Sequence, residues 1–258
     1  MIKKKKSRMM TLEESKQVVG PNLSFAAAEA YKLLRTNLAF SLPEDKKCKV
    51  IGITSALAGE GKSTAALNLA YTVAQEGSRV LLMEADLRLP NMAKRLGIHS
   101  KPGLSNLLAG QCSGNDALQR CALSKDVFVM TAGDIPPNPA ELLNSEYMHQ
   151  AITALSEVFD AIIVDLPPVN VVTDALLASK FVDGIVVVVR QQYCEKKALS
   201  ELIRQMKFAN AKVLGFVVTD ADTQKKSYKH GKSNYYYKTG GAESYAKSAK
   251  NAAAPQKK

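Results

Sequence analysis

The sequence has no tryptophan, three histidines and only four cysteines in 258 residues. The cysteines form no C-x-x-C pair and show no metal-ligand spacing; they are Cys48, Cys112, Cys121 and Cys194. Such spacing argues against a disulfide framework and against a structural zinc site, and it fits a reduced cytosolic compartment.

Long hydrophobic runs are also missing. The longest apolar stretches, Ala161–Val164 and Ile185–Val189, have the length of β-strands, whereas a membrane-spanning helix needs about 20 apolar residues. No apolar segment follows the basic N-terminus, which therefore does not have the form of a signal peptide. With 46% hydrophobic and 23% charged residues, the composition is that of a soluble globular protein with a sizeable core.

Positive charge is concentrated at the two ends of the chain. Residues 1–10 carry a net charge of +5 and residues 223–258 a net charge of +8, so the total of +11 leaves −2 for residues 11–222. Because a nucleic-acid-binding fold usually carries its basic residues on a folded face, we expect no nucleic acid partner. Basic ends favour an acidic partner or an anionic membrane surface, or they only keep disordered tails in solution.

Strands and helices are expected to alternate between these ends. The expected strands are nearly continuous runs of Val, Ile and Leu at residues 49–54, 79–84, 127–131, 161–165, 184–189 and 212–219. The first main helix is expected to begin at Ser24 and to end before Pro43. Four more are expected at residues 62–75, 140–159, 173–181 and 195–209. Strands without polar alternation are buried on both faces, which predicts a doubly wound, mainly parallel α/β sheet with helices on both faces. The expected organisation is a basic flexible arm (1–22), one domain (23–222) and a flexible Lys/Tyr-rich tail (223–258).

One segment has the pattern of a phosphate-binding loop. Residues 56–64 read A-L-A-G-E-G-K-S-T and join an expected strand to an expected helix, as in a P-loop NTPase. Glycines let main-chain N–H groups surround a triphosphate, and the helix N-terminus adds partial positive charge. Lys62 is expected to reach the β- and γ-phosphates, and Ser63 to coordinate Mg²⁺. The predicted nucleotide-binding residues are Ala58, Gly59, Glu60, Gly61, Lys62, Ser63 and Thr64.

Two further strands end in carboxylates. Glu84 and Asp86 follow one apolar run, where strand alternation predicts that they lie on the same side. Asp165 ends a fully apolar strand, where a carboxylate usually has a partner. Beside a phosphate loop these acids can hold a metal ion or accept a proton; away from one, the first two would be ordinary solvated acids.

At these motifs the sequence resembles the cytoplasmic bacterial tyrosine kinases of capsule and exopolysaccharide synthesis. The family's nucleotide-site elements, S-x-x-x-G-E-G-K-S-T, D-x-D-x-R-x-P and I-I-x-D-x-P-P, are similar to residues 55–64, 84–90 and 162–168. Two more family segments are matched by Glu29–Leu38 and Ala132–Leu143, and the resemblance covers roughly residues 24–245. The related septum-site and partitioning ATPases carry an extra lysine early in the loop, which residues 55–58 lack.

The resemblance implies an ATP- and Mg²⁺-dependent protein-tyrosine kinase. The residues in catalytic roles would be Lys62, Glu84, Asp86 and Arg88, and the metal site would use Ser63, Asp86 and Asp165. Asp86 would take the tyrosine hydroxyl proton or aid metal binding, Asp165 would hold Mg²⁺ through water, and Arg88 would neutralise developing phosphate charge. The acceptors would be tail tyrosines of another subunit: Tyr228, Tyr235, Tyr236, Tyr237 and Tyr245.

The resemblance also implies partners and a location. Family members form rings through an E-x-x-R-x-x-R helix, and Glu29, Lys32 and Arg35 occupy that pattern here. Since lysine lacks the forked contact of arginine, we expect a weaker ring; alternatively, this helix is a plain amphipathic surface. A membrane-bound activator would act through its cytoplasmic tail, and a cognate tyrosine phosphatase would oppose the kinase. The protein would then be cytoplasmic and peripheral at the inner face of the cell membrane.

Two other functions remain open. A partitioning-type, septum-site-like ATPase would hydrolyse ATP without making phosphotyrosine, although the missing early lysine and the tyrosine-rich tail argue against it. A weakly active nucleotide-binding regulator is favoured only by Glu84, where the family has Asp, and by Thr219, where the family commonly has Asn near the adenine. One extra methylene at Glu84 could move the carboxylate by about 1 Å, and a displacement of that size can cost on the order of 100-fold in rate.

Overall fold

A computed structural model of the chain describes residues 19–221. The five tail tyrosines and the basic N-terminal residues lie outside this range, so the predicted arm, tail and domain boundaries stay predictions. The described part begins with a short 3₁₀ helix, η1 (Gly20–Asn22). The Gly20 N–H donates to Asn68 Oδ1 at 2.8 Å, which ties this segment to the following domain.

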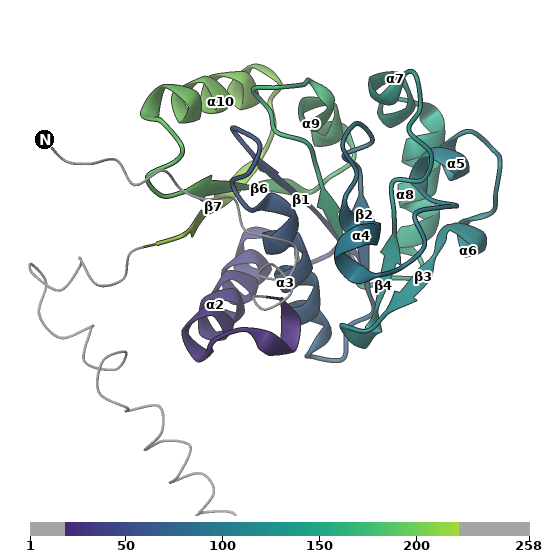
Figure 1. Cartoon of the computed structure of the whole chain (residues 1–258), viewed down its shortest axis with the longest axis horizontal. Helices are drawn as coiled ribbons and strands as arrows, with labels where there is room; N and C mark the ends of the chain where they lie inside the picture. The colour runs from purple at the N-terminus through teal and green to yellow at the C-terminus, as the bar shows by residue number, and fades with distance from the viewer. Residues whose placement is uncertain (1–18, 222–258) are drawn as a thin grey trace, which may run out of the picture. The chain divides into compact units, whose positions relative to one another are not determined.

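A seven-stranded sheet lies at the centre, in the order β3-β4-β2-β5-β1-β6-β7 (Figure 1). Its strands are β1 (Lys49–Ser55), β2 (Val80–Glu84), β3 (Gln119–Cys121), β4 (Ser124–Met130), β5 (Ala161–Asp165), β6 (Gly184–Arg190) and β7 (Val213–Thr219). All neighbouring strands are parallel except β3 and β4. The predicted doubly wound, mainly parallel P-loop NTPase fold is therefore confirmed.

Helices cover both faces of the sheet (Figure 1). The elements over one face are α2 (Phe25–Ser41), α3 (Lys62–Ala74) and α4 (Met92–Leu96). Those over the other are α5 (Leu104–Leu108), α6 (Gly114–Ala117), α7 (Pro139–Leu143), α8 (Glu146–Ser156), α9 (Asp174–Leu177), η2 (Ala178–Lys180) and α10 (Lys196–Phe208). Strand β2 shows why two cores form: Val80 and Leu82 pack with the first group, and Leu81 and Met83 with the second. Alternate residues of a strand point to opposite faces, so a fully apolar strand buries both.

The structure corrects two local predictions and adds a strand pair. The helix expected over 140–159 is divided into α7 and α8, because Ser145 starts a new helix by accepting the Met148 N–H at 3.3 Å. The helix expected over 173–181 is divided into α9 and η2. The hairpin of β3 and β4 was not predicted, because β3 has only three residues and is polar. The Arg120 guanidinium lies over the Phe128 ring at 4.6 Å from its centroid, so packing between side chains of the two strands supports this short pair.

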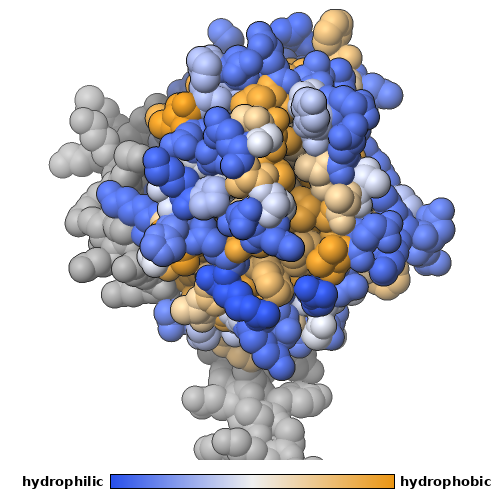
Figure 2. Space-filling view, turned by 90° about the vertical axis from the view of Figure 1, so that its right-hand side faces the viewer, coloured by the Kyte–Doolittle hydropathy of each residue, from blue (hydrophilic) through white to orange (hydrophobic). Residues whose placement is uncertain are grey.

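No helix within residues 19–221 is both long enough and apolar enough to cross a membrane. Figure 2 shows one side of the molecule, where hydrophobic residues form a band between hydrophilic ones. Exposed apolar residues are common on protein surfaces, so this band by itself does not indicate a site. The residues that position the candidate site lie instead at the carboxyl ends of the strands.

Candidate functional site

The phosphate loop has the strand–loop–helix arrangement that its sequence predicts. Strand β1 ends at Ser55 and helix α3 begins at Lys62. Between them, Gly59 has φ +81° and Gly61 has φ +93°, in the left-handed region that glycine adopts without the steric cost of a side chain. The loop therefore bends sharply over the N-terminus of α3, which has 13 residues and directs its unpaired N–H groups and its positive dipole end toward the site.

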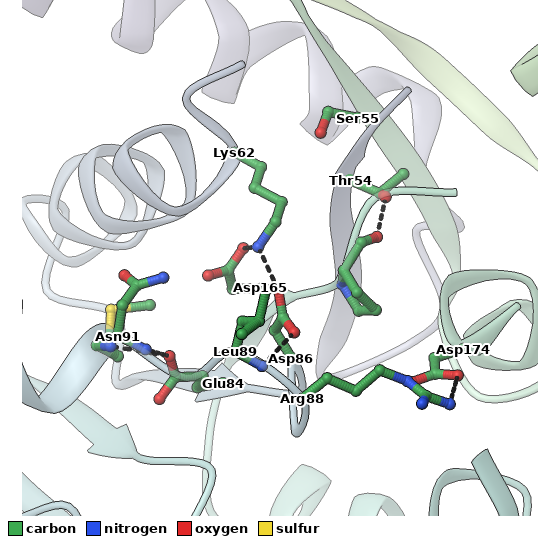
Figure 3. A network of polar contacts seen from close by, with 12 residues as sticks. Thr54, Ser55, Lys62, Glu84, Asp86, Arg88, Leu89, Asn91, Asp165 and Asp174 are labelled. Atoms are coloured by element: carbon green, nitrogen blue, oxygen red, sulfur yellow. Dashed lines mark hydrogen bonds and ion pairs between the residues drawn. The ribbon is translucent and has the colours of Figure 1, made fainter. Parts of the chain in front are cut away.

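Lys62 lies between two buried carboxylates (Figure 3). Its Nζ atom is 3.0 Å from Asp86 Oδ2 and 3.4 Å from Asp165 Oδ1. The side chains of Lys62 and Asp86 are 10% and 8% exposed, and that of Asp165 is fully buried. The second oxygen of Asp165, Oδ2, has no hydrogen-bond partner within the described part of the chain. The structure therefore brings Lys62, Asp86 and Asp165 together in a largely buried site.

The protonation of this cluster follows from burial and opposite charge. Burial alone would lower the pKa of Lys62, but the charges of Asp165 and Asp86 outweigh burial, and its pKa is raised. Burial raises the pKa of Asp165, against the charge of Lys62 and a hydrogen bond with Ser63. Lys62 thus stays cationic, and the Ser63 hydroxyl lies beside the same carboxylate.

Strand order explains why these residues meet. In the parallel ladder Asp165 pairs with Glu84 of β2 on one side and with Ile53 of β1 on the other. The carboxyl ends of β1, β2 and β5 are therefore neighbours, as expected for a ligand site of an α/β sheet.

Glu84 has a different set of contacts. Its Oε1 accepts the N–H groups of Asn91 at 2.6 Å and Met92 at 2.8 Å, and its Oε2 accepts the N–H of Ala132 at 3.2 Å. Burial raises the pKa of Glu84, while these main-chain hydrogen bonds act in the opposite direction. Both oxygens are used to hold the loop after β2 and the end of β4, so the structure does not bring Glu84 to Lys62.

Arg88 also points away from the cluster (Figure 3). It forms a bidentate contact with Asp174: Nε to Oδ2 at 2.9 Å and Nη2 to Oδ1 at 3.1 Å. The pKa of Arg88 is raised by this hydrogen-bonded carboxylate. The guanidinium predicted to neutralise phosphate charge is thus held by the first residue of α9. Asp174 was not predicted from the sequence, where the only sign of its role is an acid at the start of a helix.

The remaining predicted residues divide between the loop and helix α2. Thr64 Oγ1 accepts a hydrogen bond from Arg95 at 3.2 Å. On α2, Lys32 pairs with Glu29 at 2.8 Å. Arg35 donates to the Thr72 carbonyl at 2.9 Å and lies 2.6 Å from Glu76 Oε1, so its guanidinium joins α2 to α3.

Comparison with known proteins gives consistent matches. The family described as the AAA domain matches residues 48–217. Tyrosine-protein kinase YwqD of Bacillus subtilis (strain 168) is 37% identical over 81% of this chain and 86% of that protein. The kinase domain of Escherichia coli tyrosine kinase ETK is 30% identical, covers 84% of each chain and superposes with a TM-score of 0.73. A chimerical protein, CapA2B2, is 34% identical over 79% of this chain and 88% of that chain, also with a TM-score of 0.73.

Proposed function

The chain belongs to the AAA-domain family and, within it, to the bacterial tyrosine kinases of capsule and exopolysaccharide type, and from this premise we propose that it is an ATP-dependent autokinase. It transfers phosphate to the tail tyrosines of a neighbouring copy, and so regulates synthesis and export of the polysaccharide. The observation that supports this proposal best is the convergence of Lys62, Asp86 and Asp165 beside the phosphate loop.

The residues of the site fit a nucleotide with a divalent cation. The glycine loop provides the cradle, and Asp165 Oδ2 is a buried oxygen available to a ligand. Within residues 19–221 no group of three or more His, Cys, Asp or Glu side chains could hold a metal ion alone. That fits Mg²⁺, which usually binds one or two carboxylates together with substrate phosphates and water. Ser63, Asp86 and Asp165 would hold it, and the bound nucleotide would supply the phosphoryl group while the metal neutralises its charge.

The protein residues then have separate tasks. Lys62 binds the terminal phosphates, and Asp86 either accepts the proton of the acceptor hydroxyl or helps to hold the metal ion. Glu84 fixes the loop that follows β2 through the N–H groups of Asn91 and Met92, and it ties that loop to the end of β4 through the Ala132 N–H. Arg88 anchors the same loop to α9 through Asp174. Glu84 and Arg88 therefore position Asp86 in this proposal, and contact with the phosphate is left to Lys62 and the loop amides.

The proposal includes partners and a location. A membrane-bound activator binds through its cytoplasmic tail and brings the kinase to the inner face of the cell membrane; the similarity to a chimerical CapA2B2 protein supports such a partner. Rings form through the helix bearing Glu29, Lys32 and Arg35, and a cognate tyrosine phosphatase removes the phosphate. Fractionation with and without the activator tests the location: a fully soluble protein in the presence of activator would count against it.

Phosphopeptide mapping tests the activity. Purified full-length protein is incubated with ATP and Mg²⁺, with and without an activator fragment, and phosphotyrosine at residues 228–245 is expected. Lys62→Met should abolish the label, and replacing the five tail tyrosines with Phe should leave ATP binding intact. Absence of label in both conditions would refute the proposal. Phosphate release without protein labelling would instead favour a partitioning-type ATPase.

A further inference from the structure

The carbonyl oxygens of the phosphate loop are capped by side chains, starting at the edge of the loop. Ser55 Oγ donates to the Leu57 carbonyl at 2.7 Å. At the other end of the loop, Thr219 Oγ1 donates to the Glu60 carbonyl at 2.8 Å. Thr219 is the last residue of β7, and its contact is partly buried.

The two carbonyls between them are capped by the last residue of β6 and by a residue of the turn that follows it. The Tyr193 hydroxyl donates to the Ala58 carbonyl at 3.0 Å. Arg190 Nη1 lies 3.3 Å from the Gly59 carbonyl, and its Nε donates to Asp220 at 2.6 Å. Four successive carbonyls, those of residues 57–60, therefore each accept a hydrogen bond from a side chain, and three of the four donors come from the ends of β6 and β7.

This pattern has a consequence for the loop amides. In a planar trans peptide the C=O group and the next N–H point in opposite directions. Holding the carbonyls of residues 58–60 toward the ends of β6 and β7 therefore turns the N–H groups of residues 59–61 to the other side. Successive N–H groups that point the same way form a concave anion-binding site. A loop ordered in this way before binding loses less entropy when phosphate arrives.

We propose that Arg190, Tyr193 and Thr219, here called the outer clamp, are positioning residues that hold the phosphate loop in its nucleotide-binding form. The inference rests on the proposed function in one respect only: it takes the ligand to be a nucleoside triphosphate. Thr219 contributes most, because its contact is short and partly buried; Tyr193 follows, and Arg190, with the longest contact, contributes least. Thr219 also lies beside the second loop glycine, since a Cβ at Gly61 would be in van der Waals contact with Thr219 Cγ2 at 3.4 Å. The task of Thr219 is then to hold the loop.

Two isosteric substitutions test the outer clamp. Thr219→Val and Tyr193→Phe each remove one hydroxyl and keep the size of the side chain. Thr219→Val is expected to raise the Kd of the full chain for magnesium tripolyphosphate about fivefold in calorimetry, the ratio that one hydrogen bond provides. Tyr193→Phe is expected to raise it by a smaller factor, because its contact is exposed. The KM for ATP should rise by a similar factor with kcat unchanged. Thr219→Ser keeps the hydroxyl and should keep the affinity of the wild type. The matched control is Thr153→Val, which removes a hydroxyl on α8 that donates to the His149 carbonyl at 2.9 Å in an exposed contact.

A measurement without ligand separates this inference from the proposed function. Hydrogen–deuterium exchange over residues 56–64 should be faster in Thr219→Val and Tyr193→Phe than in the wild type, and unchanged in Thr153→Val. Unchanged exchange and unchanged Kd in both hydroxyl variants would overturn the inference while leaving the kinase proposal untouched. Faster exchange in the two hydroxyl variants, together with a wild type that binds no nucleotide, would support the outer clamp and refute the kinase proposal. If either variant fails to fold, the other and Thr219→Ser still decide the question.

Discussion

Removing the positive charge of Lys62 should destabilise the fold through the acids that it leaves behind. Lys62→Met takes away the cation 3.4 Å from Asp165 and 3.0 Å from Asp86. Asp165 is fully buried and one of its oxygens has no hydrogen-bond partner in the described residues. Breaking a buried ion pair by removing one partner costs about 3–5 kcal/mol. We expect a loss of stability at the lower end of this range, about 3 kcal/mol, because Asp165 can lose its charge by binding a proton.

Because Asp165 can bind a proton, the loss of stability in Lys62→Met depends on pH. Burial already raises the pKa of Asp165, and Lys62 opposes that rise; without Lys62 the pKa in the folded state moves further above its value in the unfolded chain. The folded variant then binds a proton more tightly than the unfolded variant does. Its stability falls as pH increases from the unfolded pKa to the folded one. The stability gap between Lys62→Met and the wild type should therefore be largest at neutral pH and shrink as pH is lowered.

Urea unfolding followed by far-UV circular dichroism at several pH values measures this gap, since the chain has no tryptophan for fluorescence. Lys62→Met/Asp165→Asn removes the buried charge as well and should recover about 2 kcal/mol at neutral pH, part of the penalty for an unpaired buried ion. Lys207→Met, an exposed lysine on α10, is the control and should change stability by less than about 0.5 kcal/mol. A gap that does not vary with pH, or a double variant no more stable than the single one, would refute the reasoning.

Three further predictions concern ion pairs and the loop after β2. Arg88→Lys should lower stability by about 1–2 kcal/mol, since lysine cannot make the bidentate contact with the buried Asp174; the same change at Arg204, whose pair with Glu201 is exposed, should have almost no effect in urea unfolding. Hydrogen bonds from Arg204 and Gln205 lower the pKa of Glu201 to about 2, so NMR should find this carboxylate ionised until the pH falls to about that value, and Arg204→Gln should return it toward the ordinary range. Glu84→Asp should lower the unfolding free energy by about 2 kcal/mol, since a shorter side chain cannot reach all three main-chain N–H groups; unchanged stability would contradict the positioning task.

Local sequence was enough to predict most of the elements. The strand at 161–165 has the bounds that its apolar run predicts, and helix α3 begins at the lysine of the loop motif. Both patterns depend on neighbours within a few residues, through strand burial and the glycine turn before a helix. Strand β3 was missed because its three residues show no apolar run, and it is supported by pairing with the neighbouring β4.

The site divides in the same way. The sequence by itself determined a phosphate loop with Lys62 at its end and acids at the ends of two apolar strands, because these features are written in contiguous residues. Only the tertiary structure decided that Asp86 and Asp165 both meet Lys62, that Glu84 and Arg88 take other partners, and that Thr219 contacts the loop. Those contacts depend on the order of the strands and on which buried main-chain groups still need a hydrogen-bond partner. Both depend on residues that are distant in the chain.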